Sequence, residues 1–183
     1  MSILYPAFTR DPITIDTTEA GDEAGVDIVV DEDAPAPITG FIYNAGKQLT
    51  KDEFAAQLTA TGAGRLQITP SKGKYCGTGT KVELIDEETD EVLEIYYLIV
   101  CGDVNGDAIG GTADISLTNK FIDGTNTNWY IKDTVADAEA KRICAELAAD
   151  VNGDGKVDSE DVNYMELVTA QLAEYSYNTE SHL

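Results

Sequence analysis

Two stretches of the chain carry the same acidic pattern: "DVNGDAIGGTAD" at residues 103–114 and "DVNGDGKVDSED" at residues 150–161, forty-seven positions later. In both, Asp or Asn recurs at alternate positions around glycine, and an Asp closes the stretch. A hard cation such as calcium takes about six to eight oxygen ligands, which a twelve-residue loop supplies by turning alternate residues inward around a sharp turn at its sixth position. The repeat therefore predicts two ion-binding loops in one chain.

The second stretch meets these requirements closely. Gly155 occupies the turn position, and Lys156 would contribute its backbone carbonyl oxygen. The predicted ligands are Asp150, Asn152, Asp154, Lys156, Asp158 and Asp161.

The first stretch is less complete. Ala108 stands where the loop needs glycine, Gly110 replaces an apolar residue, and Gly111 offers no side chain at the ninth position. A single acidic turn often binds no metal, but two in register, each followed by an amphipathic helix, favour two calcium ions. The predicted ligands of the first stretch are Asp103, Asn105, Asp107, the Ile109 carbonyl and Asp114. They include fewer carboxylates than the second set, so the first loop is predicted to bind calcium more weakly.

A helix is predicted after each acidic stretch. "TADISLTNKFI" at 112–122 follows the first, and "SEDVNYMELVTAQL" at 159–172 follows the second, with apolar residues on a helical period in both. The second helix places Val162, Met165, Val168 and Leu172 on one face. Between the two repeats, a third helix over about 134–148 is predicted from Ala140, Ile143, Cys144 and Leu147.

The second half of the chain resembles a dockerin, the calcium-dependent module by which cellulosome and related cell-surface components bind cohesins. The resemblance covers residues 102 to about 175 and rests on "GDVNGD" and "ADVNGDGKVDSEDV", on Asp rather than Glu at the last loop position, and on a strand rather than a helix before the first loop. The connection through "DGTNTNWYIKDT" is longer than is usual in that family. The resemblance implies an all-α module over 102–176 with two EF-hand-like calcium loops, followed by a tail at 177–183.

The same resemblance implies a function and a surface. The expected function is non-catalytic, calcium-dependent docking to a cohesin of a scaffoldin or cell-surface anchoring protein, at a secreted, extracellular or cell-surface location. Carried onto this chain, the family's recognition positions are Thr112, Ala113, Asn119 and Lys120 in the first repeat and Ser159, Glu160, Glu166 and Leu167 in the second. The two sets differ in charge, which favours a single docking orientation.

Residues 37–101 are predicted to form a small, β-rich α+β module, so the fold class expected for the whole chain is α+β. Strands are expected at 38–43, 65–69, 80–86 and 92–100, and a helix begins at Thr50, which forms a capping box with Glu53. The "GTGTKVEL" stretch and the hairpin that runs into "GDVNGD" resemble the X modules that precede some dockerins. Because only Gly102 separates the last strand from Asp103, we expect this module to pack on the dockerin-like part.

Residues 1–36 have the composition of an acidic, proline-rich linker, in which strands at 13–16 and 26–30 could join a sheet as an edge segment. The start "MSILYPAFTR" lacks the features of a signal peptide, so we expect Met1 to be either an added start residue or a cut inside a longer protein. The net charge of −22 disfavours nucleic acid and anionic membrane surfaces as partners. The cysteines are expected to be buried thiols, with a single bridge between Cys76 and Cys101 as the alternative.

Three other functions compete with docking. An enzyme is disfavoured because the lone histidine is His182, close to the chain end, and no Ser or Cys nucleophile pattern is present. A carbohydrate-binding module would use Trp129, or Tyr96 and Tyr97, as a stacking platform. The third competing function, which the sequence leaves open, is a stalk or adhesin segment stiffened by calcium.

Overall fold

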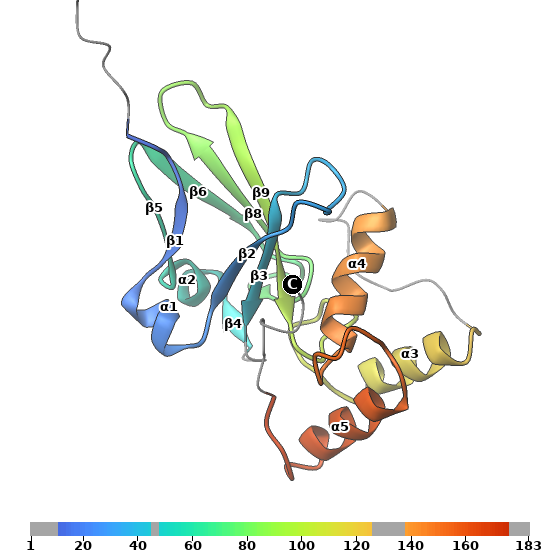
Figure 1. Ribbon diagram of the computed structural model, residues 1–183. Coiled ribbons are helices and arrows are strands. Elements are labelled where there is room, and N and C mark those ends of the chain that lie inside the picture. The colour runs from blue at the N-terminus through green and yellow to red at the C-terminus, as the bar shows by residue number, and fades with distance from the viewer. Residues whose placement is uncertain (1–10, 45–47, 126–137, 176–183) are drawn as a thin grey trace, which may run out of the picture.

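The computed structural model describes residues 11–44, 48–125 and 138–175, and its centre is a five-stranded sheet (Figure 1). The strand order is β2-β3-β9-β8-β6, and neighbouring strands are antiparallel except for the parallel pair β3 and β9, in which Gly40 lies opposite Tyr96. The strands are β2 (Asp27–Val30), β3 (Gly40–Asn44), β9 (Val92–Val100), β8 (Lys81–Asp86) and β6 (Gly64–Thr69).

Both faces of this sheet are buried. Along β9, Tyr97 and Ile99 point into one hydrophobic cluster, while Tyr96 and Leu98 point into another on the opposite face. Alternate residues of a strand face opposite sides, so a strand covered on both sides has a continuous apolar sequence. The run "YYLIV" at 96–100, in which every residue is buried, is explained by this double burial, whereas Val92 and Leu93 at the start of the strand are exposed.

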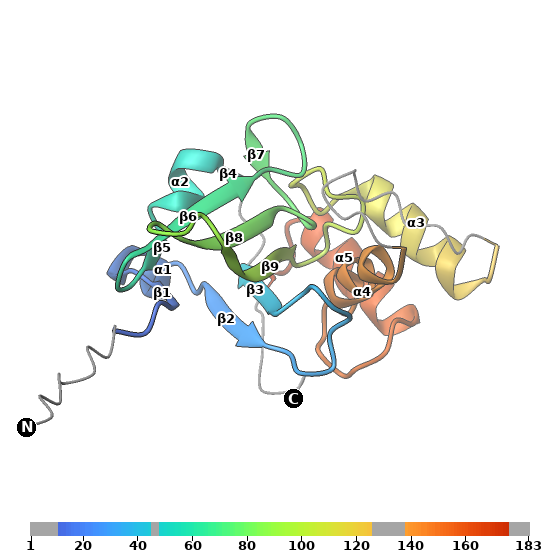
Figure 2. The same ribbon diagram turned by 90° about the horizontal axis from the view of Figure 1, so that it is seen from above.

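One face is covered by short elements from the first half of the chain, most of which lie in Figure 2 at the end of the molecule away from the C-terminal helices. The side chains of Phe54 and Leu58 pack there against the sheet. The elements are α1 (Glu19–Glu23), α2 (Lys51–Ala55) and the two-stranded pairs β1 (Ile15–Thr17) with β5 (Leu58–Ala60) and β4 (Leu49–Thr50) with β7 (Tyr75–Cys76). The predicted capping box at the start of α2 is confirmed, since Glu53 N donates to Thr50 Oγ1 and Thr50 N donates to Glu53 Oε2.

The other face is covered by α4 (Ala138–Ala149), and this overturns the expected all-α C-terminal module. The helix places Ala145, Ala148 and Ala149 in one cluster with Phe41 and Tyr97 of the sheet. Small side chains let the helix backbone approach the sheet closely, so α4 completes the core of the β-rich half instead of joining an independent helical module. The result is a mixed α/β structure built on one sheet, and the expectation that the two parts pack together is confirmed.

The remaining helices, α3 (Thr112–Ile122) and α5 (Ser159–Thr169), lie beside each other beyond the end of the sheet (Figure 1). Helix α3 has the predicted bounds and α5 ends a few residues early. The first part of the predicted middle helix, 134–137, lies outside the described residues.

Part of the N-terminal segment belongs to the sheet, because β2 is an edge strand of the sheet and pairs with β3. The expected domain boundaries stay predictions. Cys76, Cys101 and Cys144 are buried free thiols, and Cys76 and Cys101 belong to different clusters, so the bridge between them is not formed. Burial raises the pKa of Cys76 to about 11 and that of Cys144 to about 12. Within the described ranges, no helix is long and apolar enough to cross a membrane.

Candidate functional site

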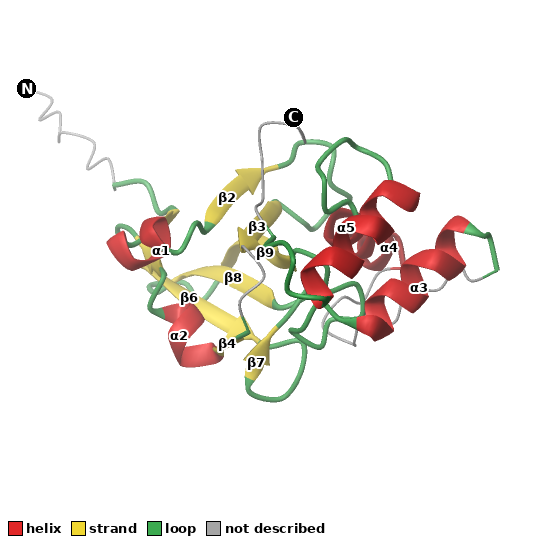
Figure 3. Ribbon diagram, turned by 90° about the horizontal axis from the view of Figure 1, so that it is seen from below, coloured by secondary structure: helices red, strands yellow, loops and turns green. Residues whose placement is uncertain are grey.

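The two acidic stretches form loops that begin beside each other. Loop 1 (residues 103–114) follows β9, and loop 2 (residues 150–161) follows α4. The amide of Gly102 donates to the carbonyl oxygen of Ala148 at 2.8 Å, which ties the start of loop 1 to the end of α4. Figure 3 shows how the loops lead into α3 and α5. The sequence repeat thus comprises a loop and the helix after it, whereas the element before the loop is a strand in one copy and a helix in the other.

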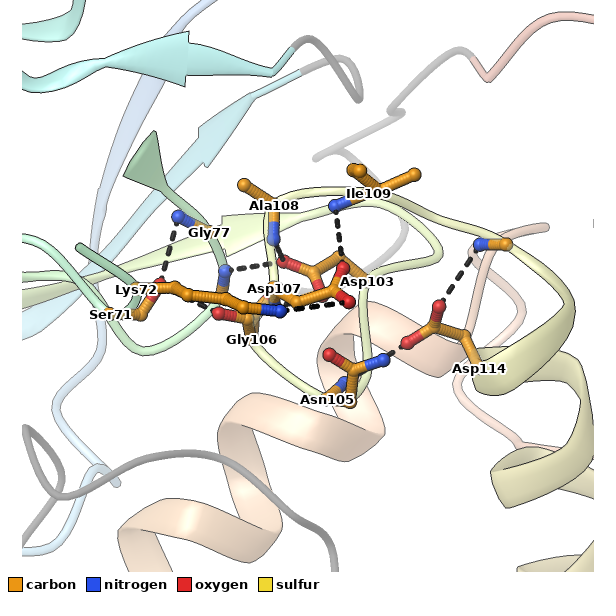
Figure 4. Close-up of polar contacts among 12 residues, drawn as sticks. Ser71, Lys72, Gly77, Asp103, Asn105, Gly106, Asp107, Ala108, Ile109 and Asp114 are labelled. Atoms are coloured by element: carbon orange, nitrogen blue, oxygen red, sulfur yellow. Dashed lines mark hydrogen bonds and ion pairs between the residues drawn. The ribbon is translucent and has the colours of Figure 1, made fainter. Parts of the chain in front are cut away.

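The first residue of each loop organises the turn in the same way. Asp103 in loop 1 and Asp150 in loop 2 each accept hydrogen bonds from the backbone amides at loop positions 5 and 6. The donors are Asp107 (2.9 Å) and Ala108 (2.8 Å) in loop 1, and Asp154 (3.1 Å) and Gly155 (2.9 Å) in loop 2. One carboxylate therefore gathers the turn of each loop around itself, as Figure 4 shows for Asp103.

The last residue of each loop closes it onto the following helix. Asp114 and Asp161 accept from the backbone amides at positions 2, 3 and 9 of their own loops, and both stand in the first turn of a helix, where a negative charge is favoured. The donors are Val104 (3.0 Å), Asn105 (3.1 Å) and Gly111 (3.0 Å) in loop 1, and Val151 (3.0 Å), Asn152 (3.3 Å) and Asp158 (2.9 Å) in loop 2. The two loops therefore share one fold.

The turn position requires a backbone conformation that favours glycine. Gly155 has φ = 80°, and its counterpart Ala108 adopts nearly the same angle, φ = 69°. An L-residue other than glycine pays about 1–2 kcal/mol for this left-handed conformation. Loop 1 thus has the same turn conformation as loop 2 despite its degraded sequence, so contacts with other parts of the chain must stabilise it.

The carboxylates at the loop ends are buried. Asp103, Asp114 and Asp161 are at most 1% exposed. Burial raises the pKa of Asp103 to about 6, against the hydrogen bonds from Thr78, Ala108 and Asp107, and the nearby Asp107 carboxylate raises it further. Burial and then the charge of Asp103 raise the pKa of Asp114 to about 7. Buried carboxylates that repel one another form a site in which a cation is favoured.

The donor set suits calcium in its chemistry: carboxylate, amide and carbonyl oxygens at the alternate positions of a twelve-residue loop. In the parts of the chain that are described, however, no three acidic, histidine or cysteine side chains already converge as a ligand cluster. The buried carboxylates accept hydrogen bonds from backbone amides instead. The loops fit calcium in residue type and backbone shape, and binding would require their side chains to rearrange.

The remaining predicted ligands lie nearer the surface. Asn105, Asp107 and Asp158 are half-buried, and Asn152, Asp154, Lys156 and Ile109 are exposed. All eight predicted partner-binding residues are exposed on the first turn and the middle of α3 and α5. They are Thr112, Ala113, Asn119, Lys120, Ser159, Glu160, Glu166 and Leu167.

Sequence reasoning missed the part of the β-rich half that supports loop 1. The Thr78 amide donates to Asp103 Oδ2 at 2.9 Å. The Ser71 hydroxyl donates to the Gly106 carbonyl at 2.9 Å, and Lys72 Nζ lies 3.3 Å from Asp107 Oδ2 (Figure 4). Tyr175 was missed as well, although its ring lies against Gly102 and Gly110. The only sequence signal was the pair of glycines in "GTGT" at 77–80, which predicts close packing but names no neighbour.

The proposed carbohydrate platform does not exist on the sheet, because Tyr96 is 2% exposed and Tyr97 is 7% exposed. Trp129 lies outside the described residues. No protein-family model, curated protein or solved structure matches this chain.

Proposed function

We propose that this chain is a calcium-dependent, non-catalytic docking module of the dockerin kind, in which α3 and α5 present the surface that binds a cohesin. The observation that carries the proposal is the hydrogen-bond scheme common to loops 1 and 2. In both loops the first and the last acidic residue each accept hydrogen bonds from backbone amides at the same loop positions. A chance acidic turn would not be expected to recur with this scheme and with a helix after each copy.

Calcium would act as a structural ion. Bound by the predicted ligands of each loop, it would neutralise carboxylates such as Asp103 and Asp114, whose raised pKa values reflect burial without enough positive charge. An ion that binds the folded state alone stabilises it by about 2.7 kcal/mol at one hundred times its dissociation constant. That amount is sufficient to decide whether the α3 and α5 pair is ordered.

The docking surface follows from the exposed positions on the two helices. The first repeat offers Ala113 and Lys120, and the matching positions of the second repeat offer Glu160 and Leu167. Leu167 is 44% exposed, so its apolar side chain is accessible to a partner at this position. A cohesin of a scaffoldin or a cell-surface anchoring protein is the proposed partner, and the proposed location is extracellular or at the cell surface.

A cohesin panel tests the proposal. The full chain is titrated against cohesins by calorimetry with calcium and then with EGTA, and we expect binding to one class of cohesin that is lost in EGTA. Asp161→Asn removes a predicted ligand and should weaken binding, whereas Asp123→Asn, an exposed change just after α3, should leave it unchanged.

The main alternative is a stalk or adhesin segment that calcium merely stiffens. It is favoured by the direct contacts between loop 1 and the β-rich half, because these contacts join the sheet to the helical part of the structure. A stalk would gain thermal stability from calcium and bind no cohesin. That result would reject docking and keep the calcium sites.

A further inference from the structure

The two loops differ in which residue donates the third hydrogen bond to the carboxylate at loop position 1. In loop 2, Asp150 accepts from Gly153 N at 2.9 Å, within its own loop. In loop 1, Asp103 accepts from Thr78 N at 2.9 Å, and Thr78 belongs to the turn before β8. The β-rich half therefore supplies to Asp103 the hydrogen bond that Gly153 of loop 2 supplies to Asp150.

A buried hydroxyl fixes the same turn to loop 1. Ser71, which is 4% exposed, donates its hydroxyl to the carbonyl of Gly106 and accepts from the amide of Gly77, both at 2.9 Å. Its own amide donates to Thr80 Oγ1 at 3.0 Å. The hydroxyl thus bridges loop 1 and the turn, and removing it would leave buried polar groups without their hydrogen-bond partner.

Packing at this contact is close. A Cβ atom added to Gly77 would lie 2.5 Å from Asp103 Oδ2 and 2.5 Å from the amide nitrogen of Ala108. Atoms do not approach to that distance, so the turn reaches loop 1 only because residue 77 has no side chain. Loop 1 is enclosed on this side by protein.

The same turn also contributes a positive charge, that of Lys72. Lys72 Nζ lies 3.3 Å from Asp107 Oδ2, the carboxylate at loop position 5. The corresponding residue of loop 2, Asp154, makes no ion pair within the described ranges. Lys72 therefore places an ammonium group beside a predicted calcium ligand of loop 1.

We propose that residues 71–78 form a built-in collar that keeps loop 1 closed without a metal ion, with Lys72 providing the positive charge at Asp107, so that calcium dependence resides in loop 2. The proposal rests on the proposed function in so far as calcium is the ion bound. It also explains how Ala108 keeps its left-handed conformation in a loop with a degraded sequence.

Hydrogen exchange of the full chain, measured by mass spectrometry in calcium and in EGTA, tests the collar. We expect the loop 1 amides to stay protected in EGTA while those of loop 2 exchange rapidly. In EGTA, Ser71→Ala should accelerate exchange in loop 1 about tenfold, since a buried hydrogen bond is lost. Equal loss of protection in both loops of the wild type would overturn the proposal.

Lys72→Gln provides a second variant that should fold, because the Lys72 side chain is about half exposed. Removing an ammonium group that calcium must displace should tighten the weaker calcium site in calorimetry about two- to fivefold, the range that a partly exposed ion pair contributes. Lys74→Gln is the matched control, because Lys74 lies on the same turn but over the ring of Tyr75. Equal affinities in the two variants would reject the role of Lys72.

Failure of the proposed function has a separate signature. If calorimetry detects no calcium binding, the calcium sites and the assignment of calcium dependence to loop 2 are both wrong. The metal-free comparison of wild type with Ser71→Ala still decides whether the collar holds loop 1.

Discussion

The hydroxyl of Thr118 lies 3.9 Å from the sulfur of Met165, and these residues are forty-seven positions apart, the same spacing that separates the two loops. Equivalent residues of the two repeats thus meet at the contact between α3 and α5. Residues related by a two-fold axis meet each other only where the axis passes between them. The internal repeat therefore brings equivalent positions of its two helices into contact, as a two-fold pairing of the repeats would require.

Met165 should be the main determinant of this pairing. Its side chain is fully buried with Cys101 and Val151, so Met165→Ala should lower the free energy of unfolding by about 2–4 kcal/mol. Urea denaturation in calcium measures the change. Glu166→Ala, the exposed neighbour, should change stability by less than about 0.5 kcal/mol, and similar losses in the two variants would argue against a core role for Met165.

The two calcium sites should bind with unequal affinity, because loop 2 contributes one carboxylate more than loop 1, and Lys72 pairs with the carboxylate at the fifth position of loop 1. Calorimetry should resolve a tighter and a weaker event in the wild type. Asp150→Ala should abolish the tighter event, and Asp103→Ala should abolish the weaker one. Survival of the tighter event in Asp150→Ala would reverse the ranking.

Without calcium, stability should fall as the pH rises. The pKa of Asp103 is raised to about 6 and that of Asp114 to about 7 in the folded chain, so the folded state holds protons that the unfolded state has released. The contribution is fully present below about pH 4, the pKa range of an unfolded Asp, and is lost as the pH rises through 6 to 7.

Thermal unfolding in EGTA between pH 4 and pH 8 measures this dependence. Asp103→Asn and Asp114→Asn should flatten it, whereas Asp123→Asn, which changes an exposed carboxylate, serves as the control for general charge repulsion. Calcium should restore stability at pH 7. A pH dependence identical in Asp103→Asn and Asp123→Asn would show that the buried carboxylates are not its source.

Gly102 should be intolerant of a side chain for two separable reasons. It has φ = 79°, and a Cβ atom there would lie 2.3 Å from the hydroxyl oxygen of Tyr175. Gly124 has φ = 66° but open space around it, so Gly124→Ala should cost only the backbone strain of about 1–2 kcal/mol. Gly102→Ala should cost clearly more by thermal unfolding, and equal costs would mean that Tyr175 does not pack there.

Local signals in the sequence predicted the elements well. The capping box of Thr50 and Glu53 and the bounds of α3 depend on residues within a few positions of each other, and both were confirmed. The shared hydrogen bonds of the two loops also follow from residues inside each twelve-residue stretch. Whether those loops bind calcium stays a prediction.

Packing across the chain was not predictable in the same way. The apolar face of α4 has the same periodicity whether it meets a helix or a sheet, so the sequence did not reveal that Ala145 and Ala148 contact the sheet. Tyr96 and Tyr97 could both be buried only because α2 and α4 cover opposite faces. The donor from Thr78 is a backbone amide, which any residue but proline could provide. The residue type at position 78 therefore could not predict this hydrogen bond.

The cohesin should dock in one orientation only. The internal repeat offers a partner two related helices, but the exposed residues at equivalent positions differ: Lys120 corresponds to Leu167, and Ala113 corresponds to Glu160. A partner surface matched to one set would face unpaired charge after the module turned over, at a cost of several kcal/mol, on the order of 2–5. Alanine is therefore substituted at Asn119 and Lys120 in one variant and at Glu166 and Leu167 in the other, and cohesin affinity is measured by calorimetry in calcium. We expect one variant to lose binding and the other to retain it, whereas equal and mild losses in both would mean that either helix can lead.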